Sequence, residues 1–302
     1  MTIKSIIKYS FFLFIFAFTM TSCEDEIDID VEPLTEQLVV DAWLTNQADS
    51  QIIKLSMTQP YFDNKLPAGV SGATVTVTSS TGTVFEFVET ENGNYVWTPT
   101  ADETIGEVGT DYGLEITVNG QNYGSFSTMN RVPPIDSVTY EFRDDETFGP
   151  DGIYAEFFAR DPLGGGDTYW VKTFKNGVFL NKPDEINLAF DAGFSEGGSV
   201  DGLIFITPIR ESINRIADED TEDDFDVAPW AVGDEIRVEL HAINNEAFYF
   251  LATAQRQITN GNNGIFSEPV INTTGNVFRE DGEQVLGMFN VAAVSEMAVE
   301  VE

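Results

Sequence analysis

The chain has 302 residues, with 51 acidic and 15 basic side chains and a formal net charge of −36 at pH 7. Polyanion binding needs lysine and arginine at the phosphates, so this charge argues against a nucleic-acid partner and against adhesion to an anionic lipid surface. One cysteine excludes an intramolecular disulfide, and one histidine argues against the usual zinc and copper sites. The length suggests two domains with sizeable cores.

Residues 1–22 have the order of a secretory signal. Lys4 and Lys8 give a positive start, residues 11–18 (FFLFIFAF) are wholly apolar, and small and polar residues follow. The apolar run is too short to span a bilayer, which takes roughly 20 residues. We therefore predict a signal peptide over residues 1–22 and a body that is soluble after export.

The only cysteine lies at the end of this signal. Met20-Thr21-Ser22-Cys23 is similar to the bacterial lipoprotein cleavage box, with methionine in place of the usual leucine. In such a box the sulfur is lipidated and the chain is cut just before it. Two or more acyl chains give stable membrane attachment, so Cys23 predicts a lipid anchor. An ordinary signal with an incidental cysteine is the alternative.

A strongly acidic segment follows the cysteine. Five of the seven residues from Glu24 to Asp30 are acidic, and such a run stays solvated. We predict a tether over residues 23–34. Glu24, Asp25 and Glu26 are similar to the surface-export signal of Bacteroidota lipoproteins, which directs them to the outer face of the outer membrane; a plain spacer is the alternative.

Residues 35–131 consist of short pieces in which apolar and polar residues alternate. The predicted strands are Leu38–Val40, Thr74–Thr78, Val84–Val88, Tyr95–Trp97 and Leu114–Val118. Turn pairs separate them at Thr81-Gly82, Asn92-Gly93 and Asn119-Gly120. Asn-Gly is a strong hairpin signal because both residues tolerate positive φ. This spacing predicts an immunoglobulin-like β-sandwich.

The segment Arg131-Val132-Pro133-Pro134 interrupts that pattern and gives the predicted domain boundary, because proline donates no backbone hydrogen bond. Further strands are predicted in residues 132–302, at Ser137–Arg143, Ile153–Arg160, Thr168–Lys175, Leu203–Thr207, Glu235–Ala242 and Leu286–Val294. The expected fold is mainly β, with the sandwich followed by a second β-rich domain.

One amphipathic helix is predicted near residues 245–259. Asn245 is suited to its N-cap, and Asn260-Gly261 ends it. The apolar residues at helical spacing are Ala247, Phe250, Leu251, Ala254 and Ile258. We expect this face to pack on the second sheet.

The sequence offers little catalytic apparatus. On a strand, His241 would share one exposed face with Arg237 and Glu239, opposite Val238 and Leu240, which is typical of a structural histidine. There is no Gly-x-Ser-x-Gly elbow, phosphate-binding loop or dinucleotide fingerprint in the sequence. We predict no catalytic residue and no cofactor. Two acids suffice for a glycosidase, so an extracellular carboxylate-dependent hydrolase is an alternative.

An acidic loop at residues 218–226 has seven acids in nine residues. Oxygen-rich clusters suit calcium, so calcium or another ligand is possible here, although the EF-hand template fails at Asp223 and Pro229. The residues of this possible loop site are Asp218, Asp220, Glu222, Asp224, Asp226 and Trp230. A solvated loop with Phe225 and Trp230 tucked beneath it is the alternative. The other tryptophans, at positions 43, 97 and 170, lie in strand-like segments and are expected in the core.

Several motifs, in their order along the chain, resemble the family with the domain of unknown function 4249 (DUF4249). They are CEDEIDID at 23–30, LVVDAWLT at 38–45, LSMTQPYF at 55–62, VSGATVTV at 70–77, NGNY at 92–95, PPIDSV at 133–138, GIFSEPVINTTGNV at 264–277 and VLGMFNV at 285–291. Met288 stands where this family has an aromatic residue. The resemblance implies a Bacteroidota outer-membrane lipoprotein, of a kind often encoded beside TonB-dependent transporters.

We therefore expect a lipid-anchored, non-enzymatic protein of the outer-membrane surface. Its expected partners are the membrane, through Cys23, and a TonB-dependent transporter, which it would assist in nutrient uptake by binding a ligand or by docking. A structural or adhesive surface module is a further alternative. The family provides no catalytic residues, and the sequence identifies no ligand.

Overall fold

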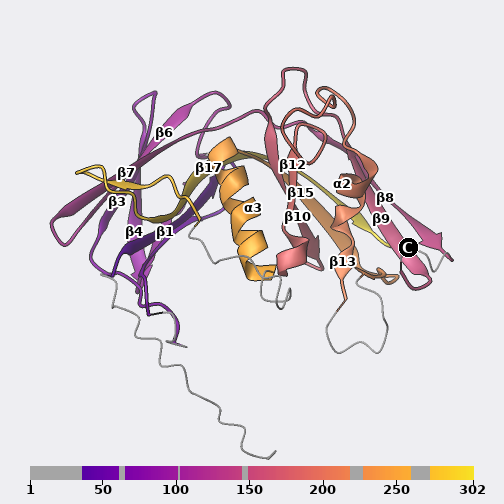
Figure 1. Cartoon of the computed structure of the whole chain (residues 1–302), viewed down its shortest axis with the longest axis horizontal. Coiled ribbons are helices and arrows are strands. Elements are labelled where there is room, and N and C mark those ends of the chain that lie inside the picture. The colour runs from indigo at the N-terminus through magenta and orange to yellow at the C-terminus, as the bar shows by residue number, and fades with distance from the viewer. Residues whose placement is uncertain (1–35, 61–64, 101–102, 145–148, 218–226, 260–272) are drawn as a thin grey trace, which may run out of the picture. The chain divides into compact units, whose positions relative to one another are not determined.

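The computed structural model describes residues 36–60, 65–100, 103–144, 149–217, 227–259 and 273–302. Residues 36–302 form one compact unit, and strands dominate it (Figure 1). The strands are β1 (Leu38–Thr45), β2 (Gln51–Met57), β3 (Thr74–Ser79), β4 (Val84–Glu91), β5 (Asn94–Trp97), β6 (Asp111–Val118), β7 (Gln121–Thr128), β8 (Ile135–Arg143), β9 (Gly152–Ala159), β10 (Thr168–Lys175), β11 (Val178–Phe179), β12 (Asn187–Phe190), β13 (Arg215–Ile216), β14 (Val227–Ala228), β15 (Glu235–Ile243), β16 (Phe278–Arg279) and β17 (Leu286–Glu300). The helices are η1 (Pro183–Glu185), α2 (Thr207–Arg210), η2 (Glu211–Ile213) and α3 (Asn245–Thr259). The predicted mainly β class is confirmed.

Of the described strands, thirteen form one sheet in the order β11-β10-β15-β17-β1-β2-β5-β4-β3-β6-β7-β16, with β12 also pairing with β10. The last long strand, β17, links the two halves of this sheet. Its first part pairs in parallel with β1, where Val39 lies opposite Leu286, and its second part pairs antiparallel with β15, from Ala293 to Glu300. Because β1 and β17 come from opposite ends of the described chain, this pairing forms only when both halves meet.

The surroundings of Gly287 explain why the motif VLGMFNV at residues 285–291 contains a glycine. Its φ is +106°, and a Cβ there would collide with the carbonyl oxygen of Val40 on β1. A Cβ on Gly275 would in turn collide with the carbonyl oxygen of Gly287. Only glycine permits both the backbone conformation and this close passage of strands.

The buried side chains form separate clusters on the two halves. Strands β1 to β7 enclose the first cluster, and Phe289 and Val291 of β17 complete it. Strands β8, β9, β10 and β15 contribute most of the second cluster. The predicted division into two domains at Arg131 is not confirmed, since the sheet continues across it through β17.

Period-two alternation explains the strands that the sequence predicts correctly. In β6, Tyr112, Leu114, Ile116 and Val118 are buried and the residues between them face outwards. The turn after β6 has positive φ at Asn119 (52°) and Gly120 (73°), as an Asn-Gly hairpin requires.

The strand predicted at Leu203–Thr207 is wrong. Ile204 makes only an isolated bridge to Arg160, and Thr207 begins the short helix α2. Pro208 lies in the first turn of that helix, where its fixed φ favours helix and its missing N–H costs nothing.

The helix predicted near residues 245–259 is confirmed as α3, which packs across one face of β10 and β17 (Figure 1). Its buried side chains are Ala247, Phe248 and Leu251. The predicted stripe is therefore only partly correct: Phe248 takes a buried position, with its ring 5.7 Å from that of Phe190, while Ile258 is 59% exposed.

Candidate functional site

The edge of the sheet at β7 is joined to β17 by side chains. The Ser125 hydroxyl donates to the carbonyl oxygen of Asn276 (2.7 Å), and the Val291 N–H donates to the Ser127 hydroxyl oxygen (2.8 Å). The amide of Asn276 is paired with the backbone of Phe289 in both directions, at 2.8 Å each. These buried bonds satisfy polar groups where no strand ladder connects β7 to β17.

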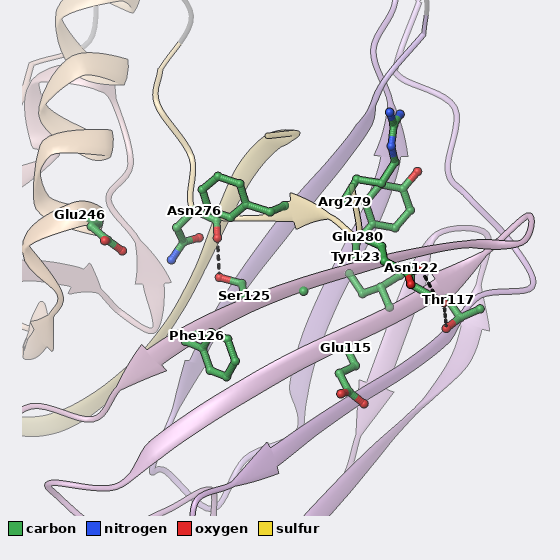
Figure 2. A pocket seen from close by; sticks show the side chains of 13 residues that line it. Glu115, Thr117, Asn122, Tyr123, Ser125, Phe126, Glu246, Asn276, Arg279 and Glu280 are labelled. Carbon is green, nitrogen blue, oxygen red and sulfur yellow. Dashed lines mark hydrogen bonds between the residues drawn. The ribbon is translucent and has the colours of Figure 1, made fainter. Parts of the chain in front are cut away.

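A groove of about 710 Å³ lies beside this edge (Figure 2). Its lining comes from β6, β7, the first turn of α3, and β16 with residues on either side of it, namely residues 115–117, 122–126, 246, 276 and 278–280. Phe126 is 80% exposed and Phe278 is 45% exposed, so two aromatic side chains face solvent in one hollow. The volume lies within the range of about 300–1,000 Å³ that is usual for ligand sites.

The floor of this groove is Gly124. In the sheet register it lies between Glu115 on β6 and Phe278 on β16. A Cβ at Gly124 would lie 3.5 Å from the carbonyl oxygen of Leu114, an ordinary contact, so the fold does not require glycine here. The missing side chain leaves the floor open between flanking side chains.

The outer backbone edge of β7 is only partly paired. The Glu280 N–H donates to the carbonyl oxygen of Asn122 (2.9 Å), and Phe278 pairs with Gly124. Alternate residues of a strand direct their backbone groups to the same side, so those of Phe126 point to this edge too. Among the described strands, none pairs with β7 on this side beyond Gly124.

Carboxylates dominate the charge of the groove. Arg279 is paired with Asp281 and Glu283 of its own turn, and the bond to Asp281 raises the pKa of Arg279. Glu115 and Glu246 also line the groove, and within the described part of the chain neither has an ion-pair partner. Figure 2 shows Glu115 and Phe126 directed to the same side of β6 and β7, away from Ser125. The groove is therefore aromatic and acidic.

The prediction that His241 is exposed is wrong, because both faces of β15 are covered. His241 is 4% exposed, and its ring lies 6.3 Å from that of Trp170 on β10. Its Nε2 atom lies 2.8 Å from Oε2 of Glu239, which also pairs with Arg237. Burial, together with the positive charges of Lys172 and Arg237, lowers the pKa of His241 well below its usual value, so the ring is neutral.

Lys172 lies in the same layer of side chains. Its Nζ atom is 4.0 Å from the centre of the Trp170 ring, and burial lowers its pKa to about 8, against an opposing effect of Asp41. Within the described residues it forms no salt bridge. The indole Nε1 of Trp170 is buried and has no hydrogen-bond partner among the described residues.

Three carboxylates come together elsewhere, with oxygens within 4.8 Å of one another, at Asp161, Asp191 and Asp201. Such a set could hold a cation. However, the two buried carboxylates already accept hydrogen bonds from the protein. Asp161 accepts one from the Tyr169 hydroxyl (2.7 Å), and Asp191 accepts one from the Gly166 N–H (2.7 Å). Burial raises the pKa of Asp161. The hydrogen bonds give this cluster a structural role in holding the glycine loop at residues 164–166.

Most site residues predicted from the sequence lie outside the described residues. These are Cys23, Glu24, Asp25 and Glu26, and also Asp218, Asp220, Glu222, Asp224 and Asp226 with Phe225. Trp230 is described, and it is 3% exposed, with its Nε1 donating to Oδ1 of Asn214 (3.1 Å). Trp230 is therefore a core residue and cannot contact a ligand at the surface. The other three tryptophans, at positions 43, 97 and 170, are partly buried and pack against the cores, as expected.

Sequence reasoning missed the groove. The signal lies in the segment Ser125-Phe126-Ser127, where small polar residues take the buried positions and an aromatic takes the exposed one. This reverses the usual order of a half-buried strand, in which apolar side chains face inwards. A large exposed apolar residue in such a pattern indicates an interaction surface.

The fold and groove define a mainly β protein with an open, aromatic and acidic sheet edge. The family profile described as domain of unknown function (DUF4249) matches residues 24–298, so the chain belongs to this family. No curated protein and no solved structure matches it. Of the helices in the described residues, none is both long and apolar enough to cross a membrane.

Proposed function

We propose that this protein is a lipid-anchored, non-enzymatic binding protein of the outer-membrane surface that assists a TonB-dependent transporter in nutrient uptake. The observation that supports binding is the groove, in which Phe126 and Phe278 are exposed over a floor that has no side chain at Gly124. Exposed aromatics in a hollow of this size are typical of a contact site for a ligand or partner.

The anchor in this proposal is Cys23, at the end of the signal-like segment. The acidic stretch at residues 23–34 then serves as the tether. Twelve fully extended residues span about 40–43 Å, because each covers roughly 3.3–3.6 Å. A body on such a tether can reach a transporter barrel in the same membrane.

Binding is favoured over hydrolysis by the state of the titratable groups. A carboxylate-dependent hydrolase needs a general acid whose pKa is raised. Asp161 has a raised pKa, but it lies in another loop and is bonded to Tyr169 and Gly202. The histidine is buried against Glu239, with no hydroxyl group bonded to it among the described residues.

Co-purification from detergent-solubilised outer membranes tests this proposal. The tagged wild-type chain is compared with the double variant Phe126→Ser, Phe278→Ser, and with Val84→Ser, which changes an exposed valine on β4 outside the groove. We expect a barrel protein with the wild type and with Val84→Ser, and its loss with the double variant. Recovery of the wild-type chain without any barrel protein would contradict docking.

A further inference from the structure

Beyond Gly124, no described strand pairs with the outer edge of β7, and this part of the edge suggests how the groove recognises a partner. Among the described residues, this edge is paired at Asn122 by the Glu280 N–H and at Tyr123 and Gly124 by β16. Beyond that point the backbone groups of Phe126 and Thr128 are directed to the same open side. An edge strand with free N–H and C=O groups is a template on which another extended chain can pair.

Strand β7 also lacks the features that usually protect an edge. Its sequence, QNYGSFST, contains no charged residue and no proline, and its register with β6 is regular from Val118↔Gln121 to Asp111↔Thr128, with no bulge. Natural proteins commonly block exposed edges with charges, prolines or bulges. Their absence leaves β7 open to a partner strand.

Charge decides which partner fits. A second copy of this chain is disfavoured, because two chains of net charge −36 repel each other. Glu115 and Glu246 line the groove as carboxylates without an ion-pair partner in the described residues, whereas Arg279 is held by Asp281. Lysine or arginine side chains would meet these carboxylates, and their apolar stems could lie against Phe126.

We propose that the open edge of β7 at Phe126 accepts an extended, basic segment of a partner protein as an additional β-strand. This inference rests on the proposed function in taking the groove as the binding site. Successive side chains of a strand point to opposite faces, so residues i and i+2 of the added segment lie on the same face. We expect these two residues to be basic and to lie on the face of the sheet that carries Glu115 and Phe126. The strand hydrogen bonds supply affinity, and the two carboxylates supply selectivity.

Calorimetry with the purified full chain in detergent tests strand addition, using the capped peptide Val-Lys-Val-Lys-Val as probe. One control peptide has glutamate in place of lysine, and another keeps the lysines but is N-methylated on every backbone amide, which removes the donors that strand pairing needs. Amide hydrogen exchange at Phe126 and Thr128 is followed in parallel. We expect the lysine peptide to bind, more tightly at low salt, and to slow exchange at both amides. We expect no binding of either control peptide.

Variants then test the role of charge. The double variant Glu115→Gln, Glu246→Gln is expected to weaken peptide binding about 2- to 30-fold, which corresponds to roughly 0.2–1 kcal/mol for each of two exposed ion pairs. Glu86→Gln, at an exposed position of β4 outside the groove, is the matched control and is expected to bind as the wild type does.

Three outcomes would overturn strand addition. They are the absence of peptide binding, equal binding of the N-methylated peptide, and binding that leaves exchange at Phe126 unchanged. Equal binding of the N-methylated peptide would indicate recognition of a cation alone. If peptide binding fails while a barrel protein still co-purifies through the groove, strand addition is wrong and the proposed function stands. If the peptide binds and no barrel protein co-purifies, transporter docking is wrong.

Discussion

The Nε2 atom of His241 lies 2.8 Å from Oε2 of Glu239, and both side chains are buried on a face of β15 that the sequence suggests is exposed. The ring of Trp170 lies against this pair, and Lys172 lies over that ring. The only histidine of the chain is therefore part of a buried polar layer within the sheet.

Replacement of His241 by glutamine should reduce the fall in the free energy of unfolding that occurs as the pH drops below about 6.5. Folding lowers the pKa of His241. Below about pH 6.5, this imidazole therefore binds a proton in the unfolded chain but stays neutral in the folded chain. The wild type should lose up to about 2 kcal/mol between pH 6.5 and 4.5 through this residue. Urea unfolding at several pH values measures the loss, and identical pH slopes for His241→Gln and the wild type would contradict the buried, neutral ring.

Replacement of Lys172 by methionine should stabilise the protein at pH 7. The folded-state pKa of Lys172 is about 8, below its unfolded value, so the ammonium is charged in both states at pH 7 and its burial opposes folding. We expect a gain of about 1–2 kcal/mol, because contact with Trp170 offsets part of that burial cost.

The pH dependence provides the control for Lys172. Above pH 8 the folded chain releases the proton before the unfolded chain does, so the wild type gains stability as the pH rises and its difference from Lys172→Met narrows. Urea unfolding at pH 7 and pH 9.5 measures both differences. A difference that is equal at the two pH values would show that the ammonium is not desolvated.

Replacement of Ser127 by alanine should destabilise the junction between β7 and β17. The hydroxyl oxygen of Ser127 accepts hydrogen bonds from the Val291 N–H (2.8 Å) and from Nδ2 of Asn244 (2.7 Å). Both donors would lose this buried acceptor, at a cost of about 1–3 kcal/mol in the free energy of unfolding. Thr117→Val, which removes an exposed hydroxyl on β6, should cost less than about 0.5 kcal/mol. Similar losses of unfolding free energy in Ser127→Ala and Thr117→Val would argue against a stabilising role for the hydrogen bonds of Ser127.

Replacement of Gly124 by valine should weaken partner binding without lowering the free energy of unfolding. A Cβ fits at this position, and strands favour valine over glycine, so the free energy of unfolding should stay level or rise by about 0.5–1 kcal/mol. The new side chain would occupy the floor of the groove, and barrel recovery in the co-purification assay should fall. Unchanged recovery from a folded Gly124→Val protein would show that the floor contacts no partner.

The sequence predicts a strand correctly where one face of that strand is buried, because apolar and polar residues then alternate along it. The alternation in β6 and the Asn119-Gly120 turn are both local signals, and both elements form as expected. The helix α3 likewise forms where its apolar spacing predicts it, with Asn245 as its first residue and not its N-cap, while its buried face also depends on Phe190, which lies far away in sequence.

The burial of His241 and the groove at Phe126 could not be predicted in the same way. Alternation along β15 shows which side chains share a face, but not that Trp170, the cross-strand partner of His241 on β10, packs beside the ring on that face. The groove depends on Asn276 and β17 meeting β7, and those segments lie some 150 residues further along the chain. Both features arise from tertiary contacts, and the local signal for the groove is limited to the inverted order of small polar and aromatic residues at Ser125-Phe126-Ser127.

Site-specific photo-crosslinking in intact cells tests the central claim most directly. The crosslinking amino acid p-benzoylphenylalanine is placed at position 126 in the groove or, as the control, at position 84 on β4, in chains that keep Cys23 or carry Cys23→Ser. If the account is correct, position 126 crosslinks to an outer-membrane protein, position 84 does not, and Cys23→Ser abolishes the crosslink. Crosslinks of equal yield at both positions, or none at position 126 in the anchored protein, would contradict it.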